Sequence, residues 1–273
     1  MKQVDFQSES LRLAGIQADC LTLGCLRGFK HFEVFLRGRE ELILRVNKTE
    51  RSTNRLSIYM MQKRVYSGLT SLGIARARLD GAISEKTRKM IQNSIGEDTV
   101  VPVSPLDQDL KNDTTKTNFL IAAYARYRRP YVWLRSNQDQ QRLHSSTSSI
   151  DTEEDCPLEL DTVINWKTKD IKLWDIVAEL LKLTLSPPPI NPFTVDHTFF
   201  DNLPLEEAVV ATGSMINFLS TLYLQQYSFS DKIFDDLRLL HARHYTLLDE
   251  LQSFLEVHHR QKMAKETHGI GGN

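Results

Sequence analysis

Cysteine is scarce in this chain, which has only three cysteines among its 273 residues: Cys20, Cys25 and Cys156. Their spacing does not match any common metal-binding pair, and three thiols cannot pair off completely within one chain. A disulfide-stapled scaffold and a zinc finger are therefore excluded. Free thiols are typical of a reducing compartment.

Long hydrophobic runs are also missing. The opening residues, MKQVDFQSESLRL, lack the apolar run of a signal peptide, and no stretch contains the roughly 20 apolar residues that span a bilayer. We therefore expect an intracellular protein, in the nucleus or cytoplasm, without a membrane partner.

The motifs of common catalytic sites are absent as well. The sequence has no Gly-x-Ser-x-Gly elbow, no glycine-rich loop followed by Lys-Ser/Thr, and no Gly-x-Gly-x-x-Gly after a strand. We therefore expect no enzymatic activity, no cofactor and no small-molecule substrate.

Charge is unevenly distributed along the chain, although the net charge is only −1. Residues 1–135 carry 23 Lys and Arg against 14 Asp and Glu, a charge of +9, and the remainder carries 11 against 21, a charge of −10. The two halves either have solvated surfaces that happen to differ, attract each other, or bind separate partners of opposite charge.

The N-terminal part reads as a mixed domain, residues 1–135. Apolar and charged residues alternate in 32–36 and 42–46 around a turn, which predicts a β-hairpin. Residues 21–26 can add a strand, and residues 130–134 a last one. Helical periods follow Thr53 and Ser84, and residues 119–127 are predicted to form a helix that Pro130 ends.

The C-terminal part reads as all-helical. Residues 136–156 are rich in Ser and acidic residues and predict a flexible linker. Helices are expected over 171–185, ended by three prolines, and over 205–224, opened by Pro204. With a long final helix they would form an acidic bundle, residues 157–265, before a disordered tail, 266–273. The predicted fold class is α+β.

The final helix, residues 230–263, is the most regular pattern in the chain. Its apolar positions advance in alternating steps of four and three residues: Ile233, Leu237, Leu240, His244, Leu247, Leu251, Phe254 and His258. A helix of about 33 residues is nearly 50 Å long, whereas a domain of about 117 residues is roughly 35 Å across. The helix should overhang its bundle.

An apolar stripe on an overhanging helix needs cover from another surface. We therefore predict a protein interface, made with another chain or with the N-terminal domain, in the distal half of the helix. It would comprise Leu247, Leu251, Phe254, Leu255 and His258.

Two other kinds of site deserve comparison. His241 and His244 share a helix face, but two ligands are too few for a metal site, so a structural role is favoured over a metal-dependent enzyme. The N-terminal half interleaves arginine with aromatic rings, as single-strand-binding surfaces do. The candidate residues for nucleic acid or an acidic partner are Arg55, Arg64, Arg126, Tyr127, Arg128, Arg129, Tyr131, Trp133 and Arg135.

These patterns predict a non-enzymatic subunit or adaptor of a larger intracellular assembly. Its partners would be other protein subunits or a second copy, bound through the long helix and the basic N-terminal surface. The alternative is a nucleic-acid-binding protein that uses the Arg/aromatic-rich half.

Overall fold

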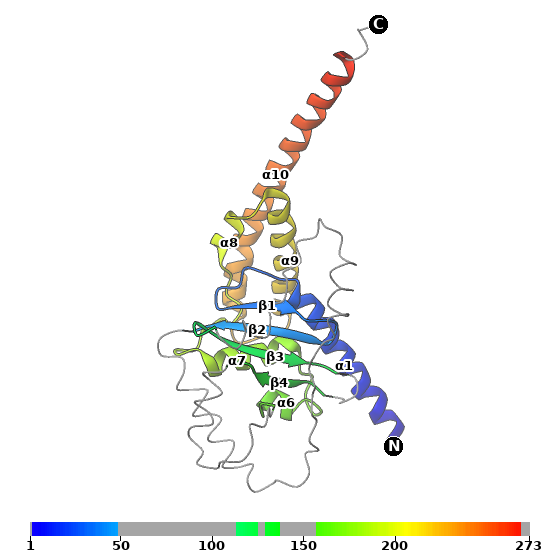
Figure 1. The fold of residues 1–273 in the computed structure, drawn as a ribbon, viewed down its shortest axis with the longest axis vertical. Coiled ribbons are helices and arrows are strands. Elements are labelled where there is room, and N and C mark those ends of the chain that lie inside the picture. Colours follow the sequence, from blue (N-terminus) through cyan, green and yellow to red (C-terminus); the bar gives the residue numbers. More distant parts are fainter. Residues whose placement is uncertain (1, 49–112, 125–128, 137–156, 269–273) are drawn as a thin grey trace. The chain divides into compact units, whose positions relative to one another are not determined.

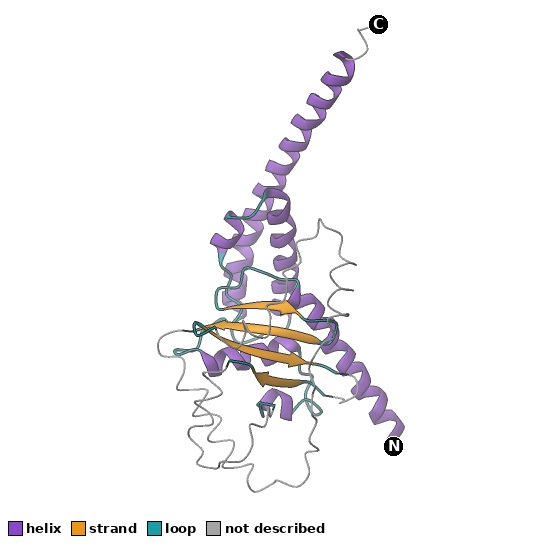
Figure 2. Ribbon diagram, viewed as in Figure 1, coloured by secondary structure: helices purple, strands orange, loops and turns teal. Residues whose placement is uncertain are grey.

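The computed structural model describes residues 2–48, 113–124, 129–136 and 157–268. It contains a four-stranded antiparallel sheet in the N-terminal half and mostly helices in the C-terminal half (Figures 1 and 2). The α+β prediction is confirmed. The predicted helices after Thr53 and Ser84 and nearly all of the predicted linker lie outside the described residues.

The described residues form two compact units. Unit 1 comprises residues 1–25 and 31–192, and unit 2 comprises residues 26–30 and 193–273. This division differs from the predicted domains, because α6 (Asp161–Ile164) and α7 (Leu173–Thr184) belong to the sheet unit. A five-residue segment near the N-terminus belongs instead to the helical unit.

The sheet of unit 1 has the strand order β1 (Phe32–Leu36), β2 (Glu41–Asn47), β3 (Lys116–Ala122) and β4 (Tyr131–Leu134). The predicted hairpin is confirmed, with Phe32 opposite Val46 and Leu36 opposite Leu42. The predicted last strand is confirmed as β4. Alternation identified the hairpin because successive side chains of a strand point to opposite faces.

The prediction of a helix over residues 119–127 was wrong for its described part. Residues 116–122 form β3, which pairs with β2 on one side and β4 on the other. Phe119 and Leu120 are adjacent in sequence and both buried. A strand that is buried on both faces reads as a continuous apolar run, which periodicity alone does not distinguish from a buried helix.

The first element is also a correction. Residues 21–24, predicted as part of a strand, belong to the helix α1 (Lys2–Gly24). Its buried residues Leu13, Ile16, Cys20 and Leu23 follow steps of three and four residues, as one helix face requires. At the end of α1, a Cβ on Gly24 would lie 2.3 Å from Cγ of Leu36, so glycine permits close approach to β1.

Helices α1 and α7 contact each other, and both contact β2. The Asp19 carboxylate on α1 accepts a hydrogen bond of 3.2 Å from the backbone N–H of Leu173, the first residue of α7. This bond satisfies one of the free N–H groups at the helix start. The predicted helices over 171–185 and 205–224 are confirmed as α7 and α9 (Leu205–Leu224).

Cys20 and Cys25 should differ sharply in reactivity. Burial raises the pKa of the Cys20 thiol to about 12, whereas Cys25 is exposed. Because only the thiolate reacts, we expect iodoacetamide at pH 8 to modify Cys25 in native protein while Cys20 reacts only after denaturation. Peptide mass spectrometry measures both. Equal modification of the two would contradict the packing of α1.

Candidate protein interface on the long helix

Unit 2 is built around α10 (Ser230–His268), a helix of 39 residues. It begins at Ser230 as predicted and continues to His268, past residue 265, where the predicted domain ended. None of the helices in the described parts of the chain combines the length and the apolar run needed to cross a membrane. With a rise of 1.5 Å per residue, α10 is about 58 Å long.

One side of the first half of α10 is buried. Ile233, Leu237, Leu240 and Leu247 are at most 7% exposed, and α10 contacts α9 extensively. The apolar stripe read from the sequence is therefore internal core up to Leu247. Leu247, predicted as an interface residue, is 2% exposed.

His244 joins α10 to α9 through a hydrogen bond. Its Nδ1 lies 2.8 Å from the Oγ1 of Thr212 on α9, and this hydroxyl lies 2.7 Å from the carbonyl oxygen of Ala208. Because the hydroxyl has one proton to donate, we assign it to Ala208 and place the imidazole proton on Nδ1. A Cβ on Gly213 would lie 3.3 Å from the His244 ring. Gly213 therefore serves close packing.

His241 and His244 do not converge on one site. His241 is exposed and stacks on Tyr245 at 6.3 Å between ring centroids, whereas His244 is half-buried against α9. Within the described ranges, no group of three or more His, Cys, Asp and Glu side chains is arranged to hold a metal ion.

A second side of α10 is joined to α8 (His197–Asp201) by a histidine–aspartate contact and by an ion pair. Nε2 of His197 lies 3.4 Å from Oδ1 of Asp236, and Arg243 lies 3.0 Å from Asp201. The side chain of Asp236 is largely buried, and this burial raises its pKa. Hydrogen bonds from His197 and from the backbone N–H of Val195 lower the pKa, but by less.

Because the pKa of Asp236 is raised in the folded protein, Asp236→Asn should have a pH-dependent effect on stability. A carboxyl group with a raised pKa in the folded state stabilises the fold below its unfolded pKa, and that contribution is lost as the pH rises through the folded pKa. Asn can still accept the Val195 hydrogen bond, without a buried charge. We expect the variant to be the more stable protein at pH 7 and equal to wild type below about pH 3.8. Urea unfolding across this range measures the difference; a variant that is less stable at pH 7 would contradict it.

The distal half of α10 has no cover within the described part of unit 2. Every residue from Gln252 to Gln261 is exposed, including Phe254 at 57%, Leu255 at 55% and Val257 at 53%. Phe254 stacks on the ring of His258 one turn later, at 6.2 Å. Of the predicted interface residues, Phe254, Leu255 and His258 are thus open and Leu251 is half-buried.

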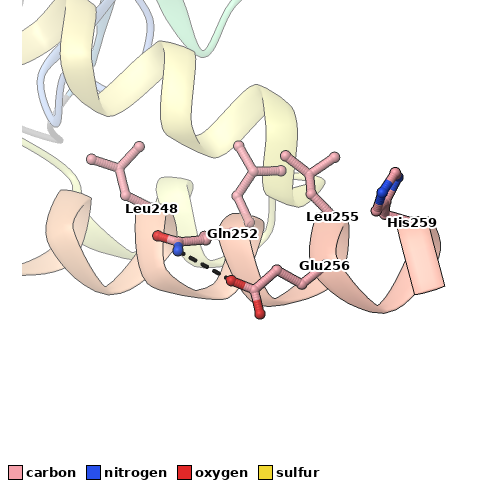
Figure 3. Close-up of a pocket in the computed structure, with 6 residues that line it drawn as sticks. Leu248, Gln252, Leu255, Glu256 and His259 are labelled. Atoms are coloured by element: carbon pink, nitrogen blue, oxygen red, sulfur yellow. Dashed lines mark hydrogen bonds between the residues drawn. The ribbon is translucent and has the colours of Figure 1, made fainter.

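A shallow hollow runs along the same part of the helix. Figure 3 shows its labelled side chains along one turn after another of α10, with Gln252 donating a 3.2 Å hydrogen bond to Glu256. The lining residues are Leu248, Leu251, Gln252, Leu255, Glu256 and His259. Leucine side chains with polar groups at their margin are suited to receive an apolar surface of another protein.

Sequence reasoning missed a further feature of α10. Phe234, Tyr245 and Leu248 are 53%, 64% and 38% exposed, on the side next to the buried stripe. The sequence shows these apolar positions but not which of them the other helices cover.

The predicted nucleic-acid site is described only in part. Arg55, Arg64, Arg126, Tyr127 and Arg128 lie outside the described residues. The remaining four side chains form a ladder on one side of β4. Their successive contacts are Arg129 over Tyr131 at 4.6 Å, Tyr131 stacked on Trp133 at 5.6 Å, and Arg135 over Trp133 at 5.9 Å.

The ladder is mostly internal packing. Trp133 is 3% exposed and packs with Ile43, Leu120 and Ala122, and Tyr131 is half-buried against this cluster. Nearby cations are already paired, since Arg45 lies 2.5 Å from Asp113 and Lys116 lies 2.6 Å from Glu33. In this conformation Trp133 presents little surface on which a base could stack.

The fold and the exposed helix define an α+β protein with a long terminal helix. A family model described as a domain of unknown function, DUF7886, matches residues 104–246, just over half of the chain. The chain belongs to this family. The match extends from before β3 to the first half of α10 and ends ahead of the distal half. Comparison with curated proteins and with solved structures gave no match.

Proposed function

We propose that this protein is a non-enzymatic subunit or adaptor of a larger intracellular assembly, and that the distal half of α10 is its docking element. In this proposal α8, α9 and the first half of α10 form a small helical bundle that presents the distal half to a partner protein. The basic N-terminal half provides a second contact, with an acidic surface.

The observation that carries the proposal is the continuous exposure of residues 252–261, which includes three large apolar side chains. Burying one such side chain contributes about 1.5–3 kcal/mol, so a partner that covers Phe254 and Leu255 gains several kcal/mol. The segment is already helical, and the pairs Gln252–Glu256 and Glu256–Arg260, at 3.2 Å and 3.5 Å, support the helix. A partner therefore meets a preorganised surface.

The test compares partner recovery by matched variants of the full chain. Phe254→Lys/Leu255→Lys adds two positive charges to exposed apolar positions, and lysine preserves helix propensity. Asp249→Asn/Ser253→Lys adds the same charge to exposed positions on the polar side, outside the hollow. Tagged proteins are purified from their own cells, with and without nuclease, and partners are quantified by mass spectrometry.

We expect stoichiometric partner proteins with wild type and with the Asp249→Asn/Ser253→Lys control, and their recovery should be insensitive to nuclease. Recovery should fall at least tenfold with Phe254→Lys/Leu255→Lys. Equal recovery by all three proteins would refute docking through this surface.

The second candidate function is nucleic-acid binding, favoured by the positive charge of residues 1–135, which carry 23 Lys and Arg against 14 Asp and Glu. Phosphate contacts make affinity fall steeply with salt. Partner recovery that depends on nuclease, together with single-strand affinity that drops between 50 mM and 200 mM salt, would support this function over docking.

A further inference from the structure

Four exposed apolar side chains of α10, together with His241, form a second stripe beside the one that packs on α9. We call it the outer stripe, and its members recur at steps of seven, four, three and seven residues. The outer stripe comprises Phe234, His241, Tyr245, Leu248 and Leu255, all exposed. These steps keep the side chains on one helix face.

Two other sides of the first half of α10 are covered within unit 2. One side packs on α9 through Ile233, Leu237 and Leu240. A second side is joined to α8 through Asp236 and Arg243. The outer stripe begins at Phe234, which contacts Tyr223 of α9 at 5.8 Å between ring centroids, so it continues an existing helix-helix interface outward.

We propose that the outer stripe is a self-association surface, on which α10 of a second copy of this chain packs antiparallel. This inference rests on the proposed function, because it takes α10 as the docking element. It identifies a second copy of the chain as one partner of that element. Two copies related by a twofold axis contact each other through the same patch, so each must be complementary to itself.

The charges beside the outer stripe meet that requirement. Arg238 and Glu256 are 18 residues apart, which is five full helical turns, so both lie at the same edge of the stripe. An antiparallel twofold brings the same edges of the two helices together. With the axis near residue 247, nine residues from each, Arg238 of either copy faces Glu256 of the other.

The ends of the helix favour the same orientation. Asp231 and Asp235 are exposed in the first turns, whereas Arg260 is exposed near the far end. A parallel pairing would place each of these charges beside its own copy, and like charges repel. The antiparallel pairing brings acidic first turns to the basic end of the other helix.

The size of the surface sets the expected strength. From Phe234 to Leu255 the outer stripe advances 21 residues, or about 32 Å, and paired helices lie about 8–10 Å apart. Such a strip buries on the order of 1,000 Å² in total, at the lower limit for specific association. We expect a reversible dimer with a dissociation constant on the order of micromolar.

Sedimentation velocity tests association directly. The purified full chain is measured at concentrations from about 1 to 100 times the expected dissociation constant. Tyr245→Lys/Leu248→Lys should be monomeric throughout. The matched control Leu239→Lys/Thr246→Lys adds the same charge to exposed positions on the opposite side of α10, outside residues 252–261, and should dimerise like wild type. Circular dichroism checks that each variant is folded.

Charge exchange tests the pairing. Arg238→Glu should weaken the dimer about two- to thirtyfold, because each dimer contains two exposed pairs. Arg238→Glu/Glu256→Arg should recover wild-type association. Failure of the double variant to recover would overturn the assigned register.

Cysteine crosslinking tests the orientation, in a Cys25→Ser/Cys156→Ser background. Leu248→Cys, close to the axis, should form a disulfide with itself across the dimer, and Phe234→Cys should not. Self-crosslinking at both positions would show a parallel pair and overturn the proposal.

A wild-type chain that stays monomeric at every concentration would overturn self-association and leave the proposed function standing, to be judged by its nuclease-resistant partners. A dimer that recovers no other protein would support self-association and refute docking to a different partner protein.

Discussion

Phe29→Ala is expected to destabilise unit 2 by about 3–5 kcal/mol, the usual cost of truncating a buried phenylalanine. Phe29 is 7% exposed and makes edge-to-face contacts with Phe193 and Phe218, with ring centroids 6.2 Å and 5.8 Å apart. Hydrogen exchange should therefore accelerate in α9 and the first half of α10, by roughly two to four orders of magnitude.

The control for Phe29→Ala is Val210→Ala, at an apolar position on α9 that is 68% exposed. This change should alter the free energy of unfolding of unit 2, measured by hydrogen exchange, by less than about 0.5 kcal/mol. Unchanged protection of α9 in Phe29→Ala would mean that residues 26–30 are not part of the unit.

Phe119→Ala is expected to have an effect of similar size in unit 1. Phe119 is fully buried in β3, opposite Leu44 of β2 and Leu134 of β4. Its truncation leaves a cavity at the centre of the sheet and should cost about 3–5 kcal/mol. Backbone amides of β2 and β3 should exchange faster, as measured by hydrogen exchange with mass spectrometry.

Ile164→Ala is the matched control in unit 1, since Ile164 is 54% exposed on α6. It should change stability by less than about 0.5 kcal/mol. If Phe119→Ala behaved like this control, the pairing of β3 between β2 and β4 would be refuted.

The parts of the fold that could be predicted are marked by patterns within a few residues of one another in the sequence. The β1–β2 hairpin alternates apolar and charged residues, and α7 and α9 are bounded by prolines. These features act within a few residues, so a sequence displays them directly. The start of α10 at Ser230 was predicted in the same way, from its period, whereas α10 ends at His268, beyond the predicted end at residue 263.

The missed parts depend on contacts between distant residues. An apolar run such as Phe119–Ala123 fits a helix or a strand, and pairing with β2, about 75 residues earlier, decides between them. Nothing local assigns Phe29 to the helical unit. The outer stripe was missed for a related reason, because the partners of α10 decide which apolar side remains open.

The placement of Leu26–Lys30 has a consequence for biosynthesis. Its backbone is hydrogen-bonded to residues 194–196. The N–H of Lys30 donates to the carbonyl of Thr194, and the N–H of Asp196 donates to the carbonyl of Gly28. At about 5–20 residues per second, a ribosome needs roughly 8–35 s to make the intervening chain. The N-terminal segment is thus synthesised early, but it can pack into unit 2 only after residues 194–196 have been made. A fragment cut to residues 104–246 would lack Phe29 altogether, so expression of the family region alone should require this segment to be restored, by fusion or as a peptide.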